Sequence, residues 1–274
     1  MKKNFYIWVL VVIIFTGCAP KSPHEITILG MGTDYSAYPE KLNGKVKELT
    51  EKAYWAVEQD GKMTKGDVLT WKELDSIGST KNFTAYFDSS GVLTRYDLLD
   101  DDNTSRYSDA GIFSGGKHVR WEYWMRDSIL SYWVLEYDDS NYLLGGLRYR
   151  PVVDTLFGRV MLTHDGKGNY TRSEYFDPQD KRTSYQTYLL DSEGRVTEYK
   201  SYNRNDSLVL TFINTYNEKG SPIQLDAYVE RTKEASKWEM NDLAVDDRGN
   251  CIERLCRIND GKYQIIIGRN HLYY

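Results

Sequence analysis

Short clusters of Asp, Asn and Gly recur along this chain every 12 to 14 residues, and they constrain its fold more than any other feature. From residue 165 onward the clusters begin at 165, 177, 191, 203 and 217. Asp or Asn at the first position of a turn bonds the backbone two residues on, and Gly at the fourth position accepts a positive φ. Even spacing with such turn signals predicts an all-β antiparallel meander of repeated hairpins.

The runs between the clusters alternate as β-strands do. Ile223, Leu225 and Ala227 are apolar, whereas Gln224 and Asp226 between them are polar. Counting at this spacing gives about seventeen strands, more than the roughly ten that an open twisted sheet tolerates. We therefore expect little helix and a coiled or wound sheet, which coils on itself, folds into two layers or winds into a shell.

Three segments carry expectations of their own. Residues 42–57 fit a helical stripe, but the turn spacing favours a strand that ends at the Asp60-Gly61 turn. The same spacing places a turn near residue 75. Residues 208–213 are apolar on both faces, which predicts a strand covered on both sides.

Three of the turns carry a recurring local pattern. They are Tyr86-Phe-Asp-Ser-Ser-Gly-Val92, Leu190-Asp-Ser-Glu-Gly-Arg-Val196 and Tyr216-Asn-Glu-Lys-Gly220. These stretches resemble the tyrosine-aspartate (YD) repeats of RHS-type proteins, and the whole chain resembles small Bacteroidetes lipoproteins with such hairpins. The resemblance implies structural repeats that bring no catalytic residues with them.

The N-terminus has the order of a secretory signal: Lys2 and Lys3, an apolar run from Ile7 to Phe15, then Cys18. It resembles a bacterial lipoprotein signal, which implies cleavage before Cys18 and lipid on that thiol. We expect a signal peptide over 1–17, a lipid-anchored tether over 18–40 and one β-repeat domain over 41–274. An uncut signal anchor is the alternative. The predicted location is the cell envelope, as an outer-membrane lipoprotein whose exposed side is unknown.

Charge and cysteine content argue against nucleic-acid binding, a disulfide scaffold and a cysteine metal site. Loss of Lys2 and Lys3 lowers the net charge from −5 to about −7, which is not the electrostatic footprint of a nucleic-acid binder. Cys251 and Cys256 are five residues apart on one expected strand, beyond disulfide reach, so we expect two buried free thiols. No metal-type cysteine spacing occurs.

The chain lacks the motifs of phosphate binding, nucleophilic catalysis and zinc binding. We expect no enzyme, no cofactor and no metal, although a fold never excludes a grafted site. A barrel inserted in the membrane is a further alternative, but Arg172, Glu198 and Lys200 interrupt the apolar faces that it would need.

Aromatic residues supply the candidate binding site. The chain has 23 Tyr and seven Trp, with a concentration between 121 and 137. A hairpin turn near Arg126-Asp127 would bring Trp121 and Trp133 together as cross-strand neighbours. The candidate ligand-binding residues are Trp121, Tyr123, Trp124, Tyr132, Trp133 and Tyr137. The favoured function is a non-catalytic binding or scaffold module with a protein or glycan partner, and the alternative is a carbohydrate-binding lipoprotein that uses this cluster.

Overall fold

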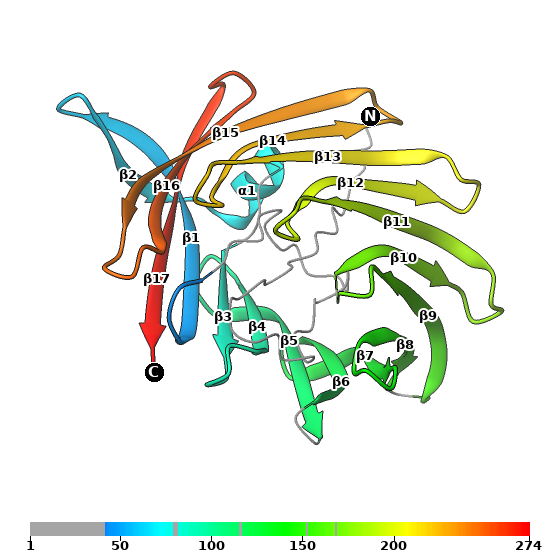
Figure 1. The fold of residues 1–274 in the computed structure, drawn as a ribbon. Helices are drawn as coiled ribbons and strands as arrows, with labels where there is room; N and C mark the ends of the chain where they lie inside the picture. The colour runs from blue at the N-terminus through cyan, green and yellow to red at the C-terminus, as the bar shows by residue number, and fades with distance from the viewer. Residues whose placement is uncertain (1–41, 79–81, 115–116, 152, 168) are drawn as a thin grey trace.

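The computed structural model describes residues 42–274 except 79–81, 115–116, 152 and 168, and its strands form one antiparallel sheet (Figure 1). The predicted leader and tether, with Cys18, lie outside the described residues. The elements are β1 (Val46–Gln59), β2 (Lys62–Val68), α1 (Trp71–Ile77), β3 (Phe83–Phe87), β4 (Leu93–Leu99), β5 (Ser105–Ser114), β6 (Lys117–Met125), β7 (Ser128–Tyr137), β8 (Leu143–Arg150), β9 (Thr155–His164), β10 (Tyr170–Phe176), β11 (Arg182–Leu190), β12 (Val196–Asn203), β13 (Leu208–Tyr216), β14 (Pro222–Val229), β15 (Glu234–Val245), β16 (Cys251–Ile258) and β17 (Tyr263–Tyr273).

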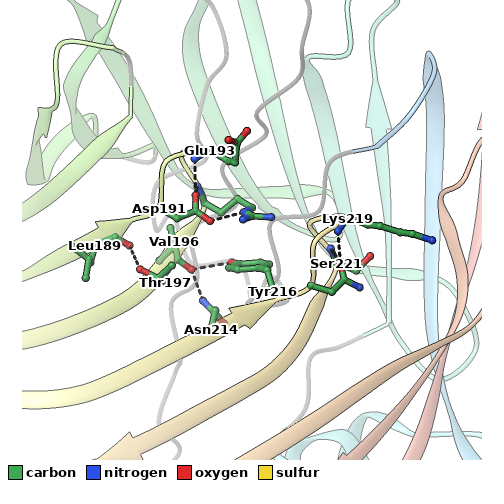
Figure 2. Close-up of polar contacts among 11 residues, drawn as sticks. Leu189, Asp191, Glu193, Val196, Thr197, Asn214, Tyr216, Lys219 and Ser221 are labelled. Carbon is green, nitrogen blue, oxygen red and sulfur yellow. Dashed lines mark hydrogen bonds and ion pairs between the residues drawn. The ribbon is translucent and has the colours of Figure 1, made fainter.

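One turn type repeats around the sheet, as the sequence predicts. In nine described hairpins the N–H of the first turn residue donates to the carbonyl four residues on. The Asp191 carboxylate accepts from the N–H groups of Glu193 and Arg195 at 3.0 and 2.9 Å (Figure 2). The Asn217 side chain does the same for Lys219 and Ser221. Because the side chain satisfies two backbone donors, each cluster specifies its own reversal.

The degenerate copies of the turn keep the same backbone. The fourth position has φ near +80° at Gly194 and Gly220. Where glycine is missing, Asn103 and Asp180 take the left-handed region there, with φ of 64° and 63°. Asn and Asp tolerate this region better than other non-glycine residues. The loss of glycine therefore leaves the hairpin intact.

The sheet closes into a barrel, so the coiled sheet that the strand count allowed is wrong, whereas the antiparallel meander is confirmed. β1 pairs with β17 along one edge and with β3 along the other, which joins the two ends of the meander. The closed ring contains sixteen strands, and β2 lies outside it as the partner of the second half of β1. A buried ion pair between Glu51 and Arg269, 2.7 Å long, spans the β1–β17 seam. Closure removes the exposed edges that an open sheet would present.

The inner wall of the barrel is mostly packed. Leu74 and Ile77 of α1 belong to the same buried cluster as Ile258 and Ile265, so this face of the strands is the inner one. Figure 1 shows α1 within the ring of strands. Residues that are direct cross-strand partners point to the same face of the sheet. Following these partners from β1 through β3, β4 and β5 to β6 shows that a second apolar cluster, which includes Trp121, also lies on the inner face.

Several local expectations meet a direct test here. Residues 46–59 are strand, as favoured, but the turn expected near residue 75 is helix α1 instead. Its capping box, in which Thr70 and Glu73 satisfy each other's backbone N–H groups, starts a helix where spacing alone predicts a turn. The prediction that residues 208–213 are covered on both faces is also wrong, because Ile213 is 45% exposed on the outer wall.

The two cysteines of β16 are free and buried, as predicted. Burial raises the pKa of the Cys256 thiol to about 12, so this thiol is protonated and inert at neutral pH. No helix in the described part of the chain is long and apolar enough to cross a bilayer.

Candidate functional site

The six aromatic residues that the sequence singles out are divided between the two walls of the barrel. Trp121, Tyr123, Trp133 and Tyr137 face inward, whereas Trp124 and Tyr132 face outward. The two-residue turn at Arg126-Asp127 makes Trp121 and Trp133 direct cross-strand partners, as expected. The six therefore do not form one platform, and ligand binding by them stays a prediction.

The outward pair is engaged in surface packing. The guanidinium of Arg120 lies 3.7 Å from the centre of the Tyr132 ring and also pairs with Glu122 at 2.8 Å. Tyr132 donates its hydroxyl to Asp154, and this hydrogen bond raises the pKa of the phenol. The Trp124 indole donates to Glu122 at 3.1 Å. These contacts occupy the polar groups of Trp124 and Tyr132, so they offer little to a ligand.

The inward residues belong to a mixed aromatic and polar area that we call the inner-wall patch. It consists of Asp109 on β5, Trp121 and Tyr123 on β6, Ser131 and Trp133 on β7, and Arg148 on β8. Strand register sets it in two rows: Asp109, Tyr123 and Ser131 are partners in one, and Trp121, Trp133 and Arg148 in the next. Arg148 donates from Nε and Nη2 to the Ser131 hydroxyl at 3.1 and 2.9 Å, which fixes the guanidinium on the wall.

Asp109 is the most unusual member of the inner-wall patch. Its residue is 1% exposed, and neither carboxyl oxygen has a hydrogen-bond partner in the described structure. Burial raises the pKa of the carboxyl well above its usual value, although the nearby Trp121 indole and the Arg148 guanidinium act in the opposite direction. Burial also lowers the pKa of Arg148. Burial therefore disfavours the charged form of both the Asp109 carboxyl and the neighbouring Arg148 guanidinium.

Other polar groups of this wall are also unmet. The indole N–H groups of Trp121 and Trp133 are buried and have no hydrogen-bond partner among the described residues, and neither has the Tyr137 hydroxyl. Buried polar groups in native proteins are nearly always bonded to protein or to ordered water, and each unmet group costs about 1–3 kcal/mol. The hydrogen-bonding capacity of two indole donors and a carboxyl group on three adjacent strands is thus not fully used, although the Trp121 indole is close enough to Asp109 to lower the pKa of its carboxyl.

An aromatic strip leads to this patch from the β4–β5 turn, where the backbone N–H of Trp71 donates to Asp101 at 2.6 Å. It consists of Trp71 on α1, Tyr107 on β5 and Tyr123 on β6, all half-buried. The Tyr107 and Tyr123 rings are nearly parallel, at 10°, with centroids 5.9 Å apart, and Trp71 lies 6.3 Å from Tyr107. The strip ends at Tyr123, which is the cross-strand partner of Asp109. Exposure thus falls from half-buried rings to a fully buried carboxyl group.

His118 borders the patch, and one of its two ring nitrogens is engaged by the backbone, whereas its buried Nδ1 has no hydrogen-bond partner among the described residues. Its Nε2 lies 3.0 Å from the Leu93 carbonyl oxygen, and burial lowers the pKa of the imidazole to about 4. A Cβ at Gly111 would overlap the His118 ring and come within 2.8 Å of Trp121, so glycine is what lets these rings pack. Among the described residues no cluster of His, Cys, Asp or Glu is placed to hold a metal ion.

Sequence reasoning finds the aromatic half of the patch and misses the polar half. Asp109, Ser131 and Arg148 are not in any motif. The available signal was the two-residue repeat of a strand. Tyr107, Asp109 and Gly111 are spaced two apart in β5 and so lie on the same face, which places Asp109 beside an aromatic residue. The repeat alone does not say whether that face is inside the barrel.

No family model matches this chain, and no curated protein matches it either. Among solved structures, a porin-like protein from Bacteroides vulgatus is similar at 13% identity and a TM-score of 0.42, covering 84% of this chain and 98% of that one. A porin-like protein from Bacteroides uniformis gives 10% identity and a TM-score of 0.37 with the same coverage. A TcdB2-TccC3 structure gives 13% identity and a TM-score of 0.35, covering 73% of this chain and 12% of that one. Such low scores carry no inference about function, and the resemblance to YD repeats stays a prediction.

Proposed function

We propose that this chain is an exported, lipid-anchored and non-catalytic binding module of the cell envelope, whose ligand site is the inner-wall patch. The leader that ends at Cys18 supports export and anchoring. One structural observation supports binding: the unmet hydrogen-bonding groups of Asp109, Trp121 and Trp133 lie together on adjacent strands. A protein used only as a scaffold gains nothing from this destabilising arrangement.

Charges on the outer wall support attachment through lipid rather than insertion of the barrel. Lys200 pairs with Glu198 at 2.8 Å and Arg172 pairs with Glu174 at 2.8 Å, in the middle of their strands. A strand surface that faces acyl chains is apolar at every second position, and a charge at the bilayer midplane costs about 2–4 kcal/mol. The outer wall of β10–β12 therefore suits water better than lipid.

Anchoring is tested by metabolic labelling with a radioactive fatty acid in a Gram-negative host. We expect the wild-type chain to carry label and to sediment with membranes. Cys18→Ser should lose the label, whereas Cys251→Ser, at a buried cysteine of the barrel, should keep it. Equal labelling of wild type and Cys18→Ser would contradict the anchor.

Binding is tested by the thermal midpoint of the full chain against a panel of saccharides, peptides, fatty acids and nucleotides. A ligand that binds only the folded state raises the midpoint by mass action. We expect at least one class to do so in wild type and to lose the effect in Trp121→Phe, which removes one indole N–H but keeps an aromatic ring. If no class in the panel shifts the midpoint, the binding role fails.

A further inference from the structure

The inner-wall patch points to a particular class of ligand. We propose that it binds a saccharide, which packs against the Tyr107–Tyr123 pair and directs its hydroxyl groups to Asp109, Trp121 and Trp133. This inference rests on the proposed binding function and narrows it. It is argued below from hydrogen-bond capacity, from charge and from the path to the site.

The buried polar groups that lack hydrogen-bond partners require a ligand that both donates and accepts hydrogen bonds. The Trp121 and Trp133 indoles only donate, whereas the oxygens of Asp109 accept. An ammonium ligand has no acceptor for the indoles, and a carboxylate or phosphate has no donor for the carbonyl oxygen that Asp109 keeps even when it is protonated. Hydroxyl groups do both. A polyhydroxylated molecule is therefore the simplest ligand that satisfies all three residues at once.

The charge of the patch also favours a neutral ligand. The guanidinium of Arg148 already donates two hydrogen bonds to Ser131, so it is not a free fork for an anion. The side chain of Asp109 lies on the same wall, and it would repel an anion when ionised and offer a cation no charge when protonated. A ligand without net charge meets neither penalty.

The aromatic strip supplies the second element of saccharide recognition. A sugar ring has one face of C–H groups and a rim of hydroxyls, so it suits an aromatic floor that is bordered by polar groups. The stacked rings of Tyr107 and Tyr123 are both half-buried rather than sealed, so they keep some aromatic surface for such a contact. Trp71 extends this surface toward the β4–β5 turn. A chain of sugars could thus enter along the strip and end at the buried Asp109.

A glycan array identifies the saccharide, with the full chain expressed with its own leader and extracted in mild detergent. The strongest glycan on the array is then titrated calorimetrically against wild type, Trp121→Phe and Asp109→Leu. We expect binding to weaken about two- to tenfold when Trp121→Phe removes one hydrogen bond. For Asp109→Leu, which removes two acceptors, we expect about tenfold or more. Trp124→Phe is the matched control, because it changes the same atoms on the outer face of the same strand, and it should bind as wild type does.

The outcomes separate this inference from the proposed function. Glycan binding that is weakened by the inner variants alone supports both. If a peptide, fatty acid or nucleotide binds and the inner variants abolish that binding, the saccharide class is overturned and the binding function stands. If a glycan binds but only Trp124→Phe weakens it, the assignment to the inner wall is overturned. If nothing in the array or the panel binds, both are overturned. Far-ultraviolet circular dichroism of each variant shows whether it folds, and Trp133→Phe replaces any variant that does not.

Discussion

The strongest test of the structure is the pH dependence that one side chain imposes on stability. Asp109 is 1% exposed, and burial raises the pKa of its carboxyl well above that of an unfolded chain, which is about 3.9. Above pH 4 the unfolded state therefore loses a proton that the folded state keeps. Stability must fall as pH rises, by about 1.4 kcal/mol per pH unit, until the pH passes the folded pKa.

Asp109→Asn should remove this penalty, because an amide has no charge to bury. The urea midpoints of wild type and variant should be close below pH 4. Above that pH the variant should become progressively the more stable, at about 1.4 kcal/mol per pH unit, up to the folded pKa. The measurement is a series of urea titrations from pH 4 to 8 on both full-length proteins.

An exposed carboxylate with the opposite shift is the control. Hydrogen bonds from Thr104 lower the pKa of Asp102, so Asp102→Asn should lose stability relative to wild type as pH rises. If the wild-type and Asp109→Asn curves run parallel at all pH values, Asp109 is ionised in the folded protein. Its buried charge would then have a partner, and the argument for an unmet site would fail.

Substitutions at the β1–β17 seam, inside strand β8 and in one turn test the structure further. Arg269→Met should cost about 3–5 kcal/mol of unfolding free energy in urea, because it leaves Glu51 as an uncompensated buried charge, and Glu51→Leu in the same chain should recover most of it. Gly145→Ala should lower the thermal midpoint by an amount that corresponds to about 1–3 kcal/mol or more, since φ is +147° and the added Cβ would overlap the Val160 carbonyl oxygen. Asn103→Gly should be neutral or slightly stabilising at φ 64°, whereas Asn103→Val should cost about 1–3 kcal/mol by the same assay, and equal midpoints for these two would refute the left-handed turn.

The hairpins could be predicted because their cause is local. At Asp191 the side chain that starts the turn and the two backbone donors that it satisfies lie within five residues. The pairing of Trp121 with Trp133 was equally accessible, since it depends only on where one two-residue turn falls. Helix α1 was missed although its signal is also local, because the Thr70–Glu73 capping box falls where the regular spacing suggests another turn.

Closure could not be predicted in the same way. It depends on β1 pairing with β17, so residues such as Glu51 and Arg269 meet across 218 positions of sequence. No turn signal encodes that contact. The sixteen strands must complete a full circle before β1 and β17 can pair. The curvature that brings them together is the sum of small twists at every pair of neighbouring strands. The exposure of Ile213 has the same origin, since only closure decides which apolar face lies inside.

The polar half of the site depends on closure too, and this explains why a search for motifs missed it. In an open sheet Asp109 would be a solvated residue on one face of an ordinary strand. In the ring that face is inside, so the carboxyl loses water, its pKa rises and the indole N–H groups beside it lose water as well. The residues acquire their chemistry from enclosure rather than from spacing. A substitution that opens the β1–β17 seam, such as Arg269→Met, should therefore disturb the inner-wall patch on the far strands β5–β8, even though it touches none of its side chains.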